Sequence, residues 1–493
     1  MKTYKNILIT VTMFSFLIGC DLEYFPTDQL SDETVKNSPE LLSNLTIGTY
    51  SRIRGTNYMR LRHFLQELPG DELAWCKNSG DHICNAYSYN RLVNSTACSN
   101  FWKEAYYGIF QANKIIEAVD DNAAQNLLQL KGENLFLRAF MNYDLVRLFS
   151  RPYSQNPEAN PGILLMDKSD ANTLSARSTV KESYEFIVND LLKAADLMQT
   201  NKSNIFASKE VAWALLARMY LYMGQNDKAI EYADKVINSG RYELVPTEEL
   251  SDYYTLLPES NPETIFAIKC QSSENLGKSG IGSLYTKEGW GEIFVSTTYQ
   301  ALIYQNPNDE RLKFVEPDYI LDAGGNKIPD LTEACGYKVV KRLDYSKYYN
   351  LKYTFQEGIA LLSSPVVLRL AEMYLIKAEA YAKTAGKEAD AIEMVNIIRR
   401  RAGLTGDQLF TPGDLKEYDS SLDIVLDERR LELAWEGHRS FDLFRNNRSL
   451  DRSFTHNEGW SGPQLILPTS NLIVPYIPEA EITLNPNLEQ NPE

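Results

Sequence analysis

Apolar residues recur every three to four positions over long stretches of this chain, which is the spacing of one buried helix face. A first series covers residues 41–53, and two longer series follow it. Their apolar positions are Trp102, Ala105, Tyr106, Ile109, Ala112, Ile115 and Ile116, and then Leu135, Ala139, Tyr143, Val146 and Phe149. Thr179 stands where its side chain can cap a further helix. The pattern predicts a mainly α-helical protein.

Two segments far apart in the chain are similar to each other. In each, a glycine turn (Gly224 or Gly386) is followed five residues later by Ala-Ile-Glu at the start of the next helix. Small residues nearby would let paired helices approach closely, as in tetratricopeptide repeats. The sequence therefore predicts a scaffold of about four tetratricopeptide-like helix pairs. The distance between the copies predicts an interrupted solenoid, and a chance similarity of two amphipathic hairpins is the alternative.

Helical periodicity fails between these regions. Residues 68–100 combine Pro69, Gly70 and Gly80 with three cysteines and several aromatic residues, which predicts a long ordered loop with a functional role. Residues 251–364 are mixed, and 264–269 and 337–340 are predicted to be short strands. A further strand is predicted over 472–477. We expect irregular loop-rich and short β excursions on the helical scaffold.

The segment 427–445 carries the densest charge pattern. Glu428, Glu432 and Glu436 recur every four residues, which places three carboxylates on one face of a predicted helix that ends at Gly437. Ser440 is predicted to cap a second short helix. Paired carboxylates can perform acid/base chemistry, as in glycosidases. The neighbouring arginines lower carboxyl pKa values, however, and so favour an Arg/Glu lattice between helices.

The start of the chain has the features of an export signal. Lys2 and Lys5 precede an apolar run, residues 7–18, that is too short to span a bilayer. It ends in Leu-Ile-Gly before Cys20, which resembles a bacterial lipobox cleaved before Cys20 and acylated at its sulfur. A plain secretory leader is the alternative. We expect a signal peptide over 1–19 and a lipidated Cys20 with a polar tether over 20–40.

Composition narrows the remaining possibilities. The net charge of −16 argues against binding to nucleic acid. Exported proteins meet oxidising conditions, so one or two disulfides are expected among Cys76, Cys84, Cys98, Cys270 and Cys335. The spacing of cysteines and histidines does not indicate zinc, although His82 beside Cys84 is a weak metal signal. No phosphate-binding, dinucleotide-binding or hydrolase motif occurs, and we expect no cofactor.

Several motifs together resemble the SusD/RagB family of surface lipoproteins. The C-terminal pieces are residues 369–375, 378–379, 398–403, 427–445, 475–478, 481–482 and 485–492, in the family's order. Pieces of the N-terminal half, including 102–113, 132–146 and 177–191, agree as well. The resemblance implies an N-terminal region over 41–225 and a C-terminal region over 226–493 in one compact fold.

The resemblance also implies a function. Such a protein would be a nutrient receptor anchored in the outer membrane, binding oligosaccharides and passing them to a SusC-like TonB-dependent transporter without catalysis. Aromatic faces and a few polar groups suit a glycan site. The candidates in non-periodic segments are Trp75, Asn85, Tyr87, Tyr89, Tyr285, Trp290 and Arg342. Peptide capture of the RagB type, a surface enzyme using the three glutamates and a ligand-free helical adaptor are the alternatives.

Overall fold

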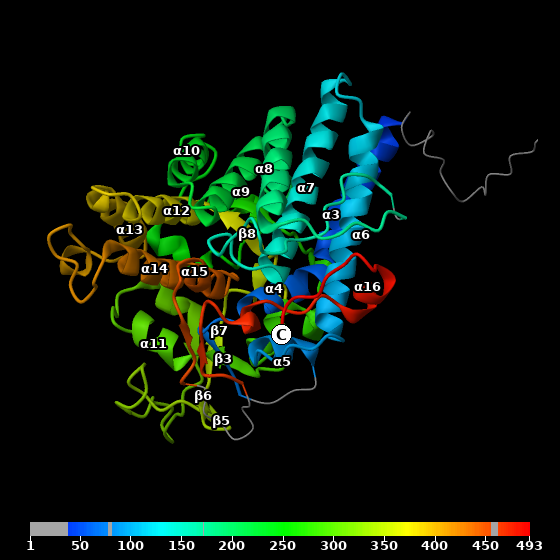
Figure 1. The fold of residues 1–493 in the computed structure, drawn as a ribbon. Coiled ribbons are helices and arrows are strands. Elements are labelled where there is room, and N and C mark those ends of the chain that lie inside the picture. Colours follow the sequence, from blue (N-terminus) through cyan, green and yellow to red (C-terminus); the bar gives the residue numbers. More distant parts are fainter. Residues whose placement is uncertain (1–37, 77–80, 171, 455–461) are drawn as a thin grey trace, which may run out of the picture.

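A row of helices forms one side of the molecule in the computed structural model, which describes residues 38–76, 81–170, 172–454 and 462–493 (Figure 1). Each helix of the row packs on its neighbours in the row. The row comprises α3 (Pro39–Arg54), α6 (Thr96–Ala118), α7 (Gln125–Phe149), α8 (Val180–Leu197), α9 (Lys209–Tyr222), α10 (Asn226–Ile237), α12 (Leu370–Ala382), α13 (Glu388–Arg401) and α14 (Ser421–Glu432). The predicted mainly α fold is confirmed.

Helix α7 is the centre of the N-terminal half. Every residue from Gln129 to Phe149 is buried, because α3, α6 and α8 cover it on several sides. Its polar side chains therefore need partners inside the protein. Arg138 donates two hydrogen bonds of 2.7 and 2.6 Å to the Asp190 carboxylate on α8, and Asn134 donates to Thr46 on α3 at 2.9 Å. These polar contacts fix the register of α7 against its neighbours.

The ends of two helices follow the local sequence. Ser38 caps α3 and Pro39 occupies its first turn, so the helix begins inside the predicted tether of residues 20–40. Thr179 caps α8 in a capping box with Glu182, as predicted. The predicted signal peptide and Cys20 lie outside the described residues.

The two similar segments form matching helical hairpins. Gly224 between α9 and α10 has φ of +70°, and Gly386 between α12 and α13 has φ of +77°, a conformation that favours glycine. Helix α10 packs directly on α12 although the segment 238–369 separates them in the chain. The two hairpins are therefore separated along the chain, as predicted, but their helices pack side by side in one uninterrupted row.

Short elements build the rest of the molecule, below the helical row in Figure 1. All named strands form two-stranded antiparallel ladders. They are β1 (Leu73–Trp75) with β3 (Ile293–Val295), β2 (Thr264–Ala267) with β8 (Val366–Arg369), β4 (Val315–Pro317) with β7 (Tyr348–Asn350), β5 (Lys341–Arg342) with β6 (Tyr345–Ser346), and β9 (Leu450–Asp451) with β10 (Leu465–Ile466). The strand predicted over 264–269 is thus confirmed in its first four residues.

Short helices complete this part of the chain. The α-helical ones are α4 (Leu61–Glu67), α5 (His82–Tyr87), α11 (Thr297–Ile303), α15 (Arg439–Arg445) and α16 (Glu479–Leu484). A π-helix, η1 (Thr56–Arg60), precedes α4. The 3-10 segments are η2 (Thr247–Asp252), η3 (Pro258–Ser260), η4 (Ser272–Glu274), η5 (Gly277–Ser279), η6 (Ile281–Leu284), η7 (Glu310–Phe314), η8 (Gln356–Gly358), η9 (Gly406–Gln408) and η10 (Asn471–Ile473).

Three local predictions differ from the structure. The region 68–100 is not a continuous loop, because it contains β1 and α5. Only isolated bridges at Tyr337 and Val339 occur where a strand was predicted over 337–340. Residues 472–477 form no strand, since a 3-10 turn occupies their start. The segment is held through side chains instead, for example by Asn491, which donates to the Pro475 carbonyl at 2.7 Å.

The expected disulfides are also absent. All five cysteines of the described residues are thiols, and four of them are buried. Cys84 and Cys98 pack in the main apolar core and behave there as small apolar side chains. Burial raises the pKa of the Cys98 and Cys270 thiols to about 11 in each case, which keeps them protonated at neutral pH.

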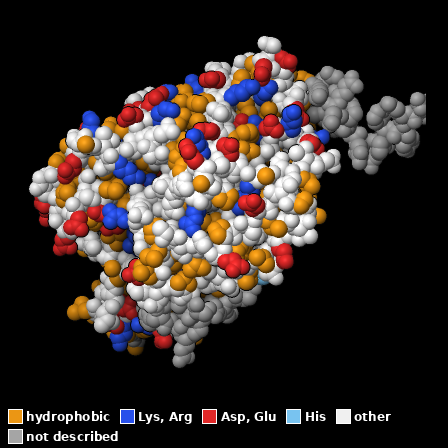
Figure 2. All heavy atoms as spheres, viewed as in Figure 1, with side chains coloured by type: hydrophobic (Ala, Val, Ile, Leu, Met, Phe, Trp, Pro, Cys, Tyr) orange, Lys and Arg blue, Asp and Glu red, His pale blue; other side chains and the backbone are white. Residues whose placement is uncertain are grey.

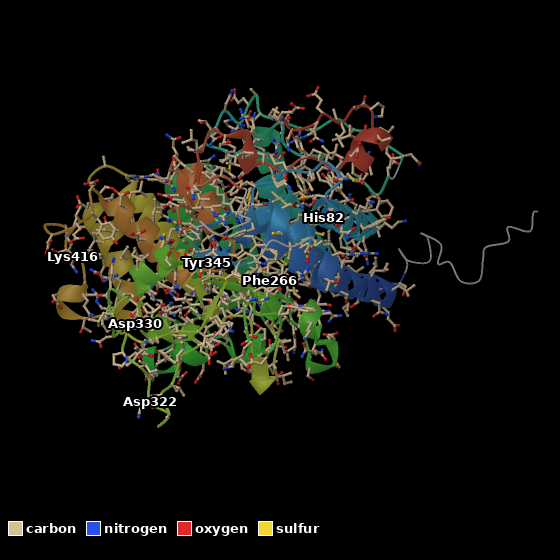
Figure 3. All side chains as sticks on the ribbon, turned by 90° about the horizontal axis from the view of Figure 1, so that it is seen from below. His82, Phe266, Asp322, Asp330, Tyr345 and Lys416 are labelled. Atoms are coloured by element: carbon tan, nitrogen blue, oxygen red, sulfur yellow. The ribbon has the colours of Figure 1, made fainter. Side chains whose placement is uncertain are left out.

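Charge is distributed without a large single-sign area on the face seen in Figure 2, where acidic, basic and apolar side chains are interspersed. A hairpin-like excursion made by residues 319–339 projects from the irregular side. In Figure 3, Asp322 and Asp330 lie at its outer part, away from His82 on α5. No helix among the described residues is long and apolar enough to cross a membrane.

Candidate functional site

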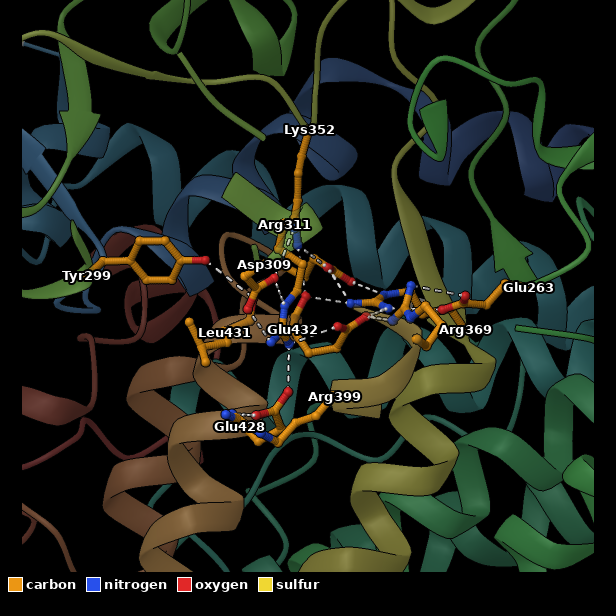
Figure 4. A network of polar contacts seen from close by, with 12 residues as sticks. Glu263, Tyr299, Asp309, Arg311, Lys352, Arg369, Arg399, Glu428, Leu431 and Glu432 are labelled. Atoms are coloured by element: carbon orange, nitrogen blue, oxygen red, sulfur yellow. Dashed lines mark hydrogen bonds and ion pairs between the residues drawn. The ribbon is translucent and has the colours of Figure 1, made fainter. Parts of the chain in front are cut away.

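The three glutamates of the segment 427–445 bind a network of arginines, in which Figure 4 shows Glu428 and Glu432. Arg369 donates to Glu432 at 2.5 Å and to Glu436 at 2.9 Å, and Arg311 donates to Glu428 at 2.7 Å. Further members are Glu263, Asp309, Lys352, Arg399 and Arg401. We call these ten residues the ion-pair cluster. Each is buried or nearly so, and the cluster joins α14 to five other chain segments.

The helix carrying these carboxylates is shorter than predicted. It ends at Glu432, and Trp435 (φ +64°) and Gly437 (φ +77°) reverse the chain, so Glu436 lies beyond the helix. The next helix begins at Arg439 after His438, which places Ser440 within it rather than at its cap. Glu436 still reaches Arg369 because the turn folds back over the same guanidinium.

Electrostatics in the cluster oppose acid catalysis. Burial alone would raise the pKa of the Glu432 carboxyl, but Arg401, Arg369 and Arg311 outweigh it and hold that pKa well below its usual value. In the same way Arg369 and Lys352 lower the pKa of Glu436 to about 2. A general acid needs a raised pKa and access to substrate. The geometry therefore favours the Arg/Glu lattice over the glycosidase interpretation.

Four of the seven predicted ligand contacts are aromatic side chains in the core. Trp75 and Tyr87 pack edge to face with ring centroids 6.1 Å apart, Tyr285 shares a 2.7 Å hydrogen bond with His63, and Tyr89 donates to the Pro69 carbonyl at 2.7 Å. All four are at most 7% exposed. These four side chains therefore offer no open ring face to a sugar.

The other three predicted contacts are accessible. Trp290 is 54% exposed, and its Nε1 donates to the Lys278 carbonyl at 3.2 Å. Arg342 donates to the carbonyl oxygens of Trp290 and Gly291 at 3.3 and 3.0 Å, so the structure brings these two predictions together. Asn85 is half-buried and accepts a hydrogen bond from Asn90 at 3.0 Å. It lines a cavity to which Trp290 and Arg342 do not contribute.

A polar depression of about 380 Å³ lies next to Trp290. We call it the polar groove. Its lining residues are Thr56, Asn57, Arg60, Leu61, Asp81, Thr96, Ala97, Asn100, Lys278 and Ser279. Lys278 connects the groove to Trp290 twice, through the carbonyl already described and through its Nζ, which lies 4.8 Å from the indole ring centre. The groove thus combines hydroxyl, amide and charged groups, and the exposed indole of Trp290 lies outside its lining, against Lys278.

The π-helix η1 supplies one wall of the polar groove. Such helices are rare and are frequently found at functional sites. Tyr58 donates to Asp144 of α7 at 2.8 Å, and Arg62 donates to the same carboxylate at 2.7 Å, which fastens η1 and the start of α4 to the central helix. Asn57 and Arg60 are then left on the side of the groove. Rigid support of this kind is what a binding site requires.

The opposite wall is made by the starts of α5 and α6. Asp81 caps α5 by accepting from the Ile83 amide at 3.1 Å, and it lies 3.7 Å from the Arg60 guanidinium. Burial lowers the pKa of Arg60, and Asp81 acts against that shift. His82 accepts from the Thr96 amide at 2.7 Å and so joins α5 to the first turn of α6. This bond gives His82 a structural role, and no group of three or more potential metal ligands occurs within the described ranges.

Sequence reasoning missed most residues of the polar groove. Asn57, Arg60 and Lys278 were not singled out because no periodicity or motif marks them, and their positions in the chain are far apart. Asp81 and Asn100 lie in the region 68–100 that was predicted to be functional. Most of the contacts predicted in that region are aromatic residues, which the structure buries, whereas the polar residues Asp81 and Asn100 reach the surface.

Comparison with known proteins identifies the family. Residues 22–221 match a family described as "Starch-binding associating with outer membrane", and residues 335–493 match the SusD family. The chain belongs to the SusD/RagB family. SusD-like protein P2 of Formosa agariphila is 28% identical over 472 residues, which cover 90% of this chain and 91% of that protein.

Solved structures of SusD superfamily proteins share the fold. One from Bacteroides thetaiotaomicron is 27% identical, covers 92% of this chain and 100% of its own, and has a TM-score of 0.82. Another, from Bacteroides vulgatus, is 29% identical, with 92% and 99% coverage and a TM-score of 0.79. The mainly helical SusD architecture with short two-stranded sheets therefore extends over nearly the whole chain. The family description connects it with carbohydrate binding and the outer membrane.

Proposed function

We propose that this SusD-like protein binds an oligosaccharide in the polar groove, with Trp290 stacking on a sugar ring at its rim. The observation that carries the proposal is the exposed indole of Trp290 beside a groove lined by amide, hydroxyl and charged side chains. Sugars present apolar C–H faces and hydroxyl groups, and this combination of side chains suits both. Arg342 supports the indole by binding the Trp290 carbonyl.

The bound oligosaccharide would pass to a SusC-like TonB-dependent transporter in the outer membrane. Support for this partner comes from the family resemblance. Of the helical row, only α6 contributes to the polar groove, through Thr96, Ala97 and Asn100 in its first two turns. The rest of the row is free to contact a transporter while a ligand is bound in the groove. Copurification of the tagged protein with a TonB-dependent transporter tests this partner, and repeated recovery of the protein alone from gently solubilised membranes would contradict it.

Trp290→Ala is expected to weaken oligosaccharide binding at least tenfold, because the variant loses the stacking surface while the fold is unchanged. The ligand is first selected on an array of glycans and peptides, which also tests the RagB-type alternative of peptide capture. Its dissociation constant is then measured by calorimetry for both proteins. Tyr107→Ala is the control, since Tyr107 is 60% exposed but does not line the groove. Equal affinities of the Trp290→Ala and unaltered proteins would exclude Trp290 from the site.

Cys20→Ser is expected to move the protein from the membrane fraction to the soluble fraction. Two or more acyl chains are needed for stable anchoring, at about 0.8 kcal/mol per buried methylene, and serine cannot carry the lipid attached to the cysteine sulfur. Fractionation of cells followed by detection of the protein measures the result. Cys335→Ser is the control and should stay in the membrane fraction. If Cys20→Ser stays in the membrane fraction as well, lipidation at Cys20 is contradicted.

A further inference from the structure

A second cavity, separate from the polar groove, lies where the C-terminal tail crosses the end of α7. It has a volume of about 80 Å³ and is enclosed by residues 89–95, the end of α7, α15 and residues 472–476. A cavity of this measure accepts several water-sized groups, enough for one small ring. Most of its lining is apolar or aromatic. We call it the arginine cavity.

The charge in the arginine cavity has one sign. Arg91, Arg147, Arg151 and Arg445 line it, and no aspartate or glutamate belongs to its described lining. Arg445 is neutralised by Glu379 and Asp442. Arg91, Arg147 and Arg151 form no ion pair with any described residue, and Arg151 donates to the neutral side chains of Gln155 and Asn471 instead. Three guanidiniums without a counter-ion are unusual in a protein of net charge −16, and burial costs a charge that has no partner.

Polar atoms around the arginine cavity lack partners within the described part of the chain. They are Nε of Arg147, Nε and Nη2 of Arg91, Oγ of Ser150 and Oη of Tyr222. Arg147, Ser150 and Tyr222 are only 5–6% exposed, so bulk water does not cover them. A buried donor left unsatisfied costs about 1–3 kcal/mol. Donors of this kind are suited to binding an anion that enters the cavity.

Aromatic rings hold two of these guanidiniums, those of Arg91 and Arg147, in place. The Arg147 guanidinium lies 4.0 Å from the ring centre of Phe441, and that of Arg91 lies 3.8 Å from the ring centre of Tyr476. Arg147 also donates to the Gly437 carbonyl at 2.6 Å. The burial that lowers the pKa of Arg91 is consistent with a site that an anion would complete.

We propose that the arginine cavity binds a small aromatic carboxylate, its acid group at Arg91 and Arg147 and its ring against Phe441 and Tyr476. A carboxylate matches the forked donors of a guanidinium, and the apolar walls favour a ring without hydroxyl groups. This site is distinct from the polar groove, because no residue lines both, although α5 with its cap and the start of α6 contribute to each.

Titration of the full-length protein with sodium benzoate tests the site by calorimetry at neutral pH. Benzamide has the same shape without the charge, and glucuronate has the acid on a hydroxylated ring. Saturable benzoate binding is expected, with benzamide and glucuronate at least tenfold weaker. Arg91→Gln is expected to weaken benzoate binding at least tenfold. Tyr222→Phe, which keeps the ring but removes the hydroxyl, is expected to weaken it about threefold.

Two further variants are controls for the benzoate titration. Arg400→Gln removes an exposed arginine on α13 and should leave benzoate binding unchanged, and Trp290→Ala should do the same. The proposal is overturned by the absence of saturable benzoate binding, by benzamide or glucuronate binding as tightly as benzoate, or by equal affinities in Arg91→Gln, Tyr222→Phe and the unaltered protein.

Discussion

An Arg369→Ala protein is expected to lose about 3–5 kcal/mol of unfolding free energy, since the change leaves buried carboxylates without their partner. Arg369 donates to Glu263 at 3.1 Å, to Glu432 at 2.5 Å and to Glu436 at 2.9 Å, and it is only 3% exposed. It also donates to the Glu432 carbonyl at 2.6 Å, just where α14 ends. Chemical denaturation followed by circular dichroism measures the loss.

Arg400→Ala provides the matched comparison. Arg400 lies one residue before Arg401 of the ion-pair cluster, but it is exposed and pairs with Glu393 at 2.9 Å. Exposed pairs contribute about 0–1 kcal/mol, so this variant should be nearly as stable as the unaltered protein. Similar small losses in both variants would show that the ion-pair cluster contributes little to stability.

Ionisation of Glu72 is expected to destabilise the protein between pH 5 and pH 8, while the buried histidines His63 and His438, whose pKa values are lowered, act in the opposite direction over the lower part of this range. Its carboxylate is buried and accepts from the Trp435 amide at 3.0 Å. Burial raises the pKa of Glu72 to about 7, against the opposing effect of Arg430. The unfolded chain has lost this proton above about pH 4.5, whereas the folded protein keeps it, so stability decreases as pH rises through 7.

Glu72→Gln removes this carboxyl, and it also removes the charge repulsion by which Glu72 raises the pKa of the neighbouring Glu67. Glutamine can still accept from the Trp435 amide but does not ionise. One pKa unit corresponds to about 1.4 kcal/mol, so the stability of the variant relative to the unaltered protein should rise by about 3 kcal/mol from pH 5 to pH 8. Urea denaturation at both pH values gives the difference. The low pKa of Glu436, about 2, acts only in more acidic solution. A relative stability that is constant with pH would contradict a raised pKa at Glu72.

The helical scaffold could be predicted because its information is local. Apolar spacing located α3, α6 and α7, a threonine suited to capping marked the start of α8, and glycine turns marked the two hairpins. Predictions failed where tertiary contacts decide the conformation. The apolar run at 472–477 predicts a strand, yet no neighbouring strand pairs with it in the described structure. The side chain of Asn491 binds this segment instead.

The candidate site was harder to predict for a related reason. Tyrosine and tryptophan in a non-periodic segment can face solvent or the core with equal ease, and nothing in the local sequence decides between them. Trp75 and Trp290 both stand near glycine, yet the first is 5% and the second 54% exposed. The polar groove also draws Arg60 and Lys278 from distant parts of the chain. Only the packed chain brings such residues together.

The direct contact between α10 and α12 has an evolutionary consequence. The segment between them leaves the helical row and returns to it at adjacent helices, so its two ends are held near each other by the scaffold itself. Closing a longer loop between fixed ends costs little extra free energy, about 0.6 kcal/mol for each doubling of length. Descendants of this protein could therefore exchange or extend the part of that segment around Lys278 and Trp290 and acquire new ligands, while Arg311 and Arg369 keep the rest of the segment fastened to α14.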